Sequence, residues 1–206
     1  MKRNLSASVI FLVFLQVLAG CSSDWGFGFT AGILSDQPSD GDIGFLSGIY
    51  TVTHGSSTDT LFFGIDSGST EYRAFLSFPL NVIPLNADIN SATLTVRIKS
   101  MGYAATVPTL LELVSYVPGA LVQGNYTDPP LTFSNGYAAS RTFNLYYGDV
   151  GNDVEIDVTS LMREAQARGL SDFQVRFSLN GVSGLVGIED DPLVAVTAPF
   201  LTVRYF

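Results

Sequence analysis

Apolar and polar residues alternate along most of the chain from about residue 42 to its end. Residues 92–99 show this most clearly, because every even position is apolar and every odd position is polar. Alternation with a period of two is typical of a β-strand that buries one face and exposes the other. The same pattern predicts strands at residues 72–80, 153–158, 172–179 and 200–206.

Less regular apolar runs predict further short strands, and turn-forming residues separate them. These runs lie near residues 45–53, 60–65, 109–117, 141–147 and 184–189. Pairs such as Asn135-Gly136 and Asn180-Gly181 mark turns between them. About ten short strands with one buried face predict an all-β chain, folded as an antiparallel two-sheet β-sandwich of jelly-roll-like form.

A single segment follows a helical pattern instead. Leu161, Met162 and Ala165 form an apolar stripe, Asp157 or Thr159 can cap its start, and Gly169 suits a left-handed stop. We therefore predict one short helix near residues 160–168. A parallel α/β sheet would need helices between its strands, and the pattern does not supply them.

The N-terminal residues have the pattern of a lipoprotein signal peptide. Lys2 and Arg3 precede an apolar run at residues 9–15, which is much shorter than the roughly 20 residues that span a bilayer. The sequence Leu18-Ala19-Gly20-Cys21 then matches the lipobox of bacterial lipoproteins. An ordinary secretory peptide with a chance cysteine is the alternative, but Cys21 is the only cysteine in the chain. We predict cleavage before Cys21 and attachment of lipid to its thiol.

These features divide the chain into a signal peptide (residues 1–20), a lipidated tether (21–41) and a β-sandwich domain (42–206). The acyl chains on Cys21 would anchor the protein without a transmembrane helix. Ser22 follows the cysteine, where Asp favours inner-membrane retention in enterobacterial lipoproteins. We therefore expect a cell-envelope protein, with the outer membrane favoured and the domain in the periplasm or on the cell surface.

The charge and the rare residue types narrow the function. The chain has 10 Lys and Arg against 19 Asp and Glu, and loss of Lys2 and Arg3 changes its net charge from −9 to −11. An acidic domain repels phosphate backbones, so nucleic acid is not an expected partner. A lone cysteine excludes an internal disulfide and a cysteine-based zinc site.

Catalysis is not expected from these residues. His54 is the only histidine, which argues against a histidine-dependent triad. A glycosidase needs two carboxylates about 5–10 Å apart across a cleft, whereas the acidic residues here fall in turns or on exposed strand faces. A lyase that uses His54 with a tyrosine is the enzymatic alternative. We predict a protein that is not an enzyme.

Tyrosines and one acidic run are the candidate binding residues. Aromatic rings can stack on sugars, and the tyrosines considered for this role are Tyr126, Tyr137, Tyr146 and Tyr147, with core or rim packing as the alternative for each. Glu189, Asp190 and Asp191 could contribute oxygen ligands to a structural Ca²⁺. A plain solvated loop is the alternative there.

Several segments, in consistent order, resemble DNRLRE-type domains. These segments are Arg73–Leu80 with Ile83-Pro84, Ile89–Leu94, Tyr126–Phe133, Asp157–Leu161 and Ala198–Val203. In the third segment Tyr126, Asp128 and Phe133 replace the Trp, Glu and Trp of the family pattern. The resemblance implies a jelly-roll sandwich of extracytoplasmic proteins, some of which bind alginate or other polysaccharides.

Together these features predict a membrane-anchored lipoprotein whose sandwich binds polysaccharide or another cell-surface component. The alternative is a structural or adhesive envelope protein that acts through protein–protein contacts. An outward cluster of aromatic side chains near Asn, Asp or Arg would favour sugar binding. An unpaired strand edge or a large apolar patch would favour assembly.

Overall fold

The computed structural model describes residues 28–55, 59–181, 183–191 and 196–206. These residues form twelve β-strands, one α-helix and two short 3₁₀ helices, and every pairing between the described strands is antiparallel. The elements are β1 (Phe29–Leu34), β2 (Gly41–Leu46), β3 (Ile49–His54), β4 (Thr60–Ile65), β5 (Glu71–Pro79), β6 (Ile89–Gly102), β7 (Thr106–Val114), η1 (Gln123–Tyr126), β8 (Ser140–Tyr146), η2 (Tyr147–Asp149), β9 (Asp153–Asp157), α1 (Thr159–Ala167), β10 (Asp172–Leu179), β11 (Gly184–Glu189) and β12 (Phe200–Tyr205). The prediction of an all-β antiparallel chain with one short helix is confirmed.

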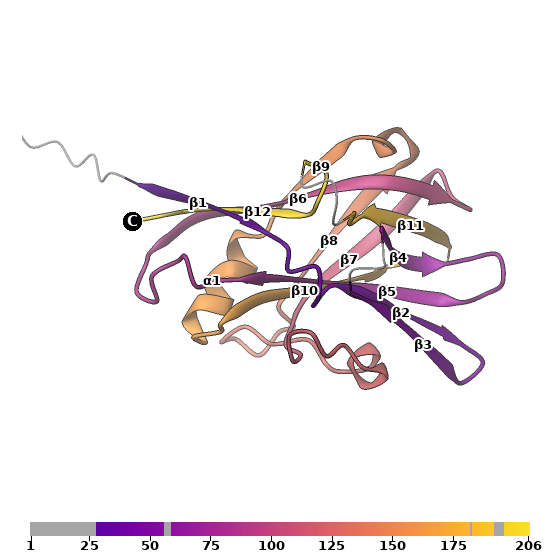
Figure 1. The fold of residues 1–206 in the computed structure, drawn as a ribbon, viewed down its shortest axis with the longest axis horizontal. Helices are drawn as coiled ribbons and strands as arrows, with labels where there is room; N and C mark the ends of the chain where they lie inside the picture. The colour runs from indigo at the N-terminus through magenta and orange to yellow at the C-terminus, as the bar shows by residue number, and fades with distance from the viewer. Residues whose placement is uncertain (1–27, 56–58, 182, 192–195) are drawn as a thin grey trace, which may run out of the picture.

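The strands form one curled sheet (Figure 1). Its main path runs β1-β12-β6-β11-β4-β5-β10-β7-β8, while β2 and β3 extend from β5, and β9 pairs with β6. Strand β6 is the longest, and it pairs with β12 near its start and with β11 near its end. Strand β4 joins the two sides of the curl, because it pairs with β11 along its length and with β5 at Gly64 and Ile65.

The main hydrophobic core lies inside the curl and follows the predicted alternation. In β6 the alternating positions Ala92, Leu94, Val96 and Ile98 are buried, as are Ile89 and Met101 near its two ends. Across the core, the ring centroids of Phe63 and Phe177 are 5.5 Å apart. Full burial of each large apolar side chain contributes about 1.5–3 kcal/mol, so these rows of residues are the principal source of stability.

Helix α1 also agrees with its prediction. Leu161, Met162 and Ala165 are buried, and Gly169 has a φ of +64° just after the helix. At the start of α1, a carboxylate oxygen of Asp157 accepts the backbone N–H of Thr159 at 3.0 Å. Within the ranges that the structure describes, no helix is long and apolar enough to cross a membrane.

The N-terminal part of the sheet begins inside the segment predicted as a tether. Residues Phe29–Leu34 form β1 and pair with β12. Glycine at position 32 suggests a linker, but here it makes room for Phe200, whose ring would lie 2.4 Å from an added Cβ. Residues 1–27, with the predicted signal peptide and Cys21, lie outside the described residues.

The predicted strand near residues 45–53 is a hairpin of two strands. Strands β2 and β3 are joined by Ser47 and Gly48, which have φ values of +50° and +89°. Two consecutive residues with positive φ make a tight turn whose twist suits adjacent antiparallel strands. The sequence is apolar on both sides of the turn and rich in Thr after it, so its pattern does not reveal that one strand ends and another begins here.

A second core covers the outer face of β5 and β10, which corrects one prediction. The alternation placed Gln174, Arg176 and Ser178 on an exposed face, but all three are buried. The segment between β7 and β8 (residues 115–139) lies across this face (Figure 1). The second core consists of Ile43, Phe75, Val114, Tyr116, Leu121 and Tyr126. Alternation within β10 cannot show that a distant segment covers its polar side.

A buried ion pair fastens this segment to the sheet. Arg176 donates from Nε to Glu112 Oε2 at 2.9 Å, and its Nη2 is 2.8 Å from the same oxygen. Its Nη1 donates to the carbonyl oxygens of Asn125, Tyr126 and Asp128 at 3.1, 3.2 and 2.8 Å. One guanidinium therefore neutralises a buried carboxylate and satisfies three carbonyls of the covering segment.

Candidate functional site

The structure separates the four tyrosines that the sequence suggests for ligand binding. Tyr126 is buried in the second core, where the guanidinium carbon of Arg73 lies 4.0 Å from the centre of its ring. The rings of Phe45 and Tyr50 lie 5.6 and 5.3 Å away. Burial is the main cause that raises the pKa of Tyr126 to about 12. This ring packs within the protein and offers no face to a ligand.

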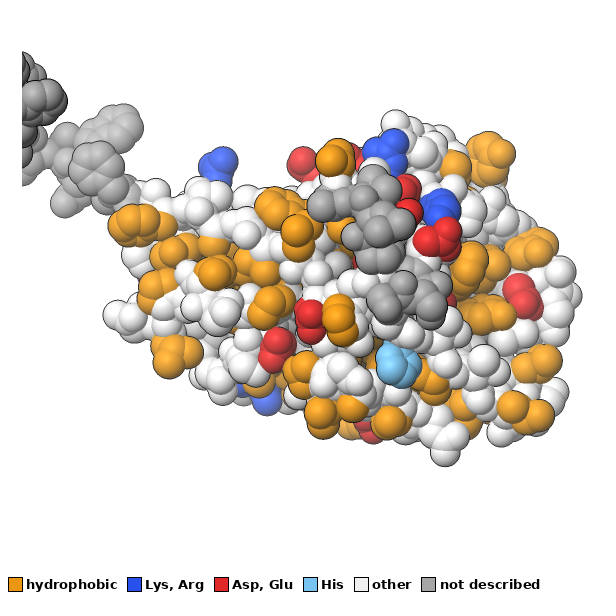
Figure 2. Space-filling view, in the orientation of Figure 1, with side chains coloured by type: hydrophobic (Ala, Val, Ile, Leu, Met, Phe, Trp, Pro, Cys, Tyr) orange, Lys and Arg blue, Asp and Glu red, His pale blue; other side chains and the backbone are white. Residues whose placement is uncertain are grey.

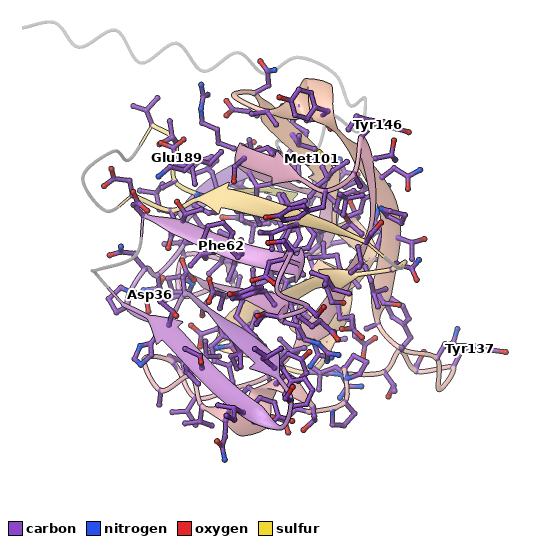
Figure 3. All side chains as sticks on the ribbon, turned by 90° about the vertical axis from the view of Figure 1, so that its right-hand side faces the viewer. Asp36, Phe62, Met101, Tyr137, Tyr146 and Glu189 are labelled. Atoms are coloured by element: carbon purple, nitrogen blue, oxygen red, sulfur yellow. The ribbon has the colours of Figure 1, made fainter. Side chains whose placement is uncertain are left out.

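The other three tyrosines are exposed, but they do not lie together. Tyr137 stands in the turn before β8, well apart from Tyr146 (Figure 3). Tyr146 ends β8 and Tyr147 begins η2. The predicted set therefore reduces to Tyr146 and Tyr147 at one place and Tyr137 at another.

A further tyrosine joins this pair. The backbone N–H of Tyr147 donates to the carbonyl of Ala105 at 2.9 Å, which brings the β6–β7 turn, in which Tyr103 lies two positions before Ala105, to the start of η2. Tyr103, Tyr146 and Tyr147 are 61%, 53% and 66% exposed, so their rings are open to solvent. We refer to these three residues as the tyrosine end. Tyr103 is one of several tyrosines in the sequence, and nothing local indicates that its turn lies beside Tyr147.

The backbone that carries the tyrosine end is held in place. The carboxylate of Asp149 accepts the N–H of Tyr146 at 2.8 Å, and the Asn152 side chain donates to the carbonyl of Gly148 at 3.1 Å. Tyr103 has a φ of +64°, an unusual conformation for a bulky side chain. Strained residues of this kind cluster at functional sites. Exposed aromatic rings beside Asp and Asn side chains are what sugar stacking and hydroxyl recognition require.

The predicted calcium residues also lie in different surroundings. Glu189 is 3.6 Å from Arg97 in an ion pair and accepts a hydrogen bond from Thr197 at 2.9 Å. Asp190 is buried, and Asp191 is half-buried. Among the described residues, no group of three or more His, Cys, Asp or Glu side chains is placed to hold a metal ion. The acidic run therefore does not act as one unit.

A second buried carboxyl, that of Asp40, acts on Asp190. Burial raises the pKa of Asp190, and the charges of Asp40 and Asp191 raise it further. Burial also raises the pKa of Asp40. Asp40 comes just before β2, in the segment predicted as a tether, and 150 positions separate it from Asp190, so local sequence carries no sign of this pair.

His54 lies at the surface, where Figure 2 shows the single histidine in pale blue. On the same face, Lys and Arg side chains are few, and those at the upper right lie beside acidic ones (Figure 2). Two such pairs are Arg97 with Asp153 at 3.1 Å and Lys99 with Asp59 at 2.9 Å. Arg97 and Lys99 are therefore neutralised locally.

Comparison with known proteins adds no relative to this geometry. No protein-family model matches the chain, and no curated protein matches its sequence.

Proposed function

We propose that this protein is a lipoprotein, anchored through lipid on Cys21, that binds polysaccharide or another cell-surface component without catalysis. The observation that carries the proposal is the tyrosine end, where three exposed rings stand on a backbone fixed by hydrogen bonds. Rings held in place lose little conformational entropy when a ligand binds. The faces of Tyr103, Tyr146 and Tyr147 would stack on sugar rings, and the nearby Asn152 could meet hydroxyls.

We further propose that the curled sheet is a jelly-roll-like sandwich of two sheets. The enclosed core between β6 and β10, and the passage of β4 from β11 to β5, support this arrangement. The order of segments that resemble DNRLRE-type domains supports it too. In such a fold, loops gather at the two ends, and ligands can bind at either end.

The two ends of the molecule would then have different roles. Strand β6 starts where Ile89 pairs with Tyr205, next to β1, and it ends one residue before Tyr103. At about 3.3 Å per residue its length is roughly 45 Å. Gly28 follows Cys21 by seven positions, a span of at most about 25 Å. The lipid would therefore hold the β1 end near the membrane and direct the tyrosine end away from it.

Replacement of Cys21 should release the protein from the membrane. We expect the Cys21→Ser variant to lose labelling by radioactive palmitate and to move from the membrane fraction to the soluble extracytoplasmic fraction, because no acyl chain then remains to bury. Cell fractionation with palmitate labelling measures both effects. Ser22→Ala is the matched control and should remain labelled. Absence of label from the wild-type protein would contradict the predicted anchor.

Removal of exposed rings should weaken polysaccharide binding. An aromatic contact contributes about 0.5–1.5 kcal/mol beyond area burial, so Tyr146→Ala and Tyr147→Ala should each lower affinity by roughly 2-fold to 10-fold. A glycan array with uronic-acid and neutral polymers, followed by calorimetry on the mature chain, measures the change. Tyr137→Ala removes a more exposed ring outside the tyrosine end and should leave affinity unchanged.

The structural or adhesive role remains the second candidate, and one observation favours it. Among the described strands, β3 pairs only with β2, so its other edge is open. Ile49 and Leu46 beside this edge are exposed, and an open edge with apolar side chains can pair with another chain. If the mature protein binds no polymer on the array and instead forms oligomers in solution, this second function is supported and the first is not.

A further inference from the structure

Three buried oxygen atoms without hydrogen-bond partners lie around one place in the fold. They are Ser35 Oγ, Asp40 Oδ2 and Asp190 Oδ2, and they account for most of the unpaired buried side-chain polar atoms among the described residues. Asp40 and Asp190 are 0% and 1% exposed. Buried polar atoms in native proteins are almost always satisfied, so this group of three requires an explanation.

Contacts from both sides bring these residues together. The other oxygen of Asp40 accepts the backbone N–H of Ser77 at 2.7 Å, which fixes its side chain. The side-chain amide of Gln37 donates to the carbonyl of Asp190 at 3.5 Å and links the segment before β2 to the end of β11. The Ser35 hydroxyl lies close enough to the Asp40 carboxyl to lower its pKa, and the charge of Asp40 raises the pKa of Asp190.

The charges around this place are negative, and within the described part of the chain no basic side chain forms an ion pair with Asp40 or Asp190. Asp36 adds to the negative potential at Asp40, and Asp191 adds to it at Asp190. No ion pair between described residues includes Asp36, Asp40 or Asp190. The internal segments outside the described ranges contain no Lys, Arg or His. The single histidine is exposed on β3. Two like charges buried without compensation are strongly unfavourable.

We propose that a divalent cation of the calcium type binds between Asp40 and Asp190. The available donors are all oxygens, which suit a hard cation and disfavour zinc or copper. Two carboxylates supply the charge, while Ser35 Oγ, nearby backbone carbonyls and water complete the shell of about six to eight ligands. The absence of a third buried acidic ligand among the described residues implies modest affinity, with a Kd of about 0.1–1 mM, typical of extracellular modules.

The ion would have a structural role that is independent of the tyrosine end. It would join the segment between β1 and β2 to the end of β11, which are far apart in sequence. A bound ion stabilises the folded state in proportion to its occupancy. The proposed site therefore includes Asp190 from the acidic run predicted at residues 189–191. Its other members, Asp40 and Ser35, lie far from that run in the sequence.

Calcium titration of the mature chain tests the proposal. After EDTA treatment, at pH 8 and 0.15 M NaCl, addition of CaCl₂ to 10 mM should raise the midpoint of thermal unfolding by several degrees. Calorimetry should show one ion bound per chain. Asp190→Asn and Asp40→Asn should each abolish the calcium-dependent shift, and they should raise the midpoint measured without calcium because each removes a buried charge.

A neighbouring acidic residue provides the control. Glu189→Gln changes the adjacent position, which pairs with Arg97, and it should keep the full calcium-dependent shift. A wild-type midpoint that does not change with CaCl₂ overturns the proposal and identifies the pair as carboxyls that share protons. A shift that persists in both Asp→Asn variants also overturns it, because the ion would then bind diffusely to the acidic surface. Neither result bears on polysaccharide binding, which is measured separately.

Discussion

Replacement of Arg176 by methionine should destabilise the protein by about 3–5 kcal/mol, because it leaves a buried charge without its partner. Glu112 would remain beneath the β7–β8 segment with no cation, and the carbonyls of Asn125, Tyr126 and Asp128 would lose a shared donor. Urea unfolding of the mature chain measures the loss. Limited proteolysis should also show faster cleavage within residues 115–139.

Two variants make the result specific. Arg141→Met removes the exposed pair of Arg141 with Asp157 and should cost no more than about 1 kcal/mol. The double variant Glu112→Gln with Arg176→Met should recover part of the stability, since no buried charge then lacks a partner. If Arg176→Met costs no more than Arg141→Met, the buried pair does not hold the covering segment.

Replacement of Gly64 by alanine should be the second large effect. Gly64 has a φ of +108° and lies where β4 pairs with both β11 and β5. An added Cβ would lie 2.1 Å from the carbonyl oxygen of Gly184, which is backbone and cannot rotate away. Conformational strain of about 1–3 kcal/mol adds to this clash. We expect a loss of at least about 3 kcal/mol and weaker pairing of β4 with β11.

Replacement of Gly48 by alanine distinguishes the steric clash from the conformational strain. It has a φ of +89°, but an added Cβ there would meet nothing within 4 Å. Gly48→Ala should therefore cost only the conformational strain, about 1–2 kcal/mol. Chemical denaturation of both variants makes the comparison. Equal losses would show that the contact between Gly64 and Gly184 has no effect of its own.

The strands with one buried face were the most predictable part of this fold. In β6 the alternation of Leu94, Val96 and Ile98 with polar residues depends only on local sequence and on one enclosed core. The helix was predictable for a similar reason, since its stripe and Gly169 are local signals. These features agree with the structure within a few residues.

The parts that sequence did not reveal depend on distant contacts. Arg176 resembles an exposed position until the β7–β8 segment covers it. Gly32 resembles a linker residue until Phe200 occupies the space beside it. In each case the decisive neighbour is far away in the chain, so neither hydrophobic period nor turn chemistry can indicate it.

The candidate sites show the same limit. Alternation in a strand predicts that Tyr146 and Tyr147 point to opposite faces with one ring outward, but both rings are exposed. Tyr126 has the same residue type, yet it is buried under Arg73. Composition identifies which side chains could bind a sugar, but burial decides which can, and burial comes from the fold.

The second core determines which parts of the protein open to solvent most easily. Strands β5 and β10 are covered on both faces, so their amide hydrogens should exchange with solvent only through global opening. The outer layer is much smaller than the inner one, and the guanidinium groups of Arg176 and Arg73 both donate hydrogen bonds to its crossing segment. Residues 115–139 should therefore detach as one cooperative unit, at a lower free energy than global unfolding requires. The packing of β6 and β10 in the main hydrophobic core should stay intact during this opening.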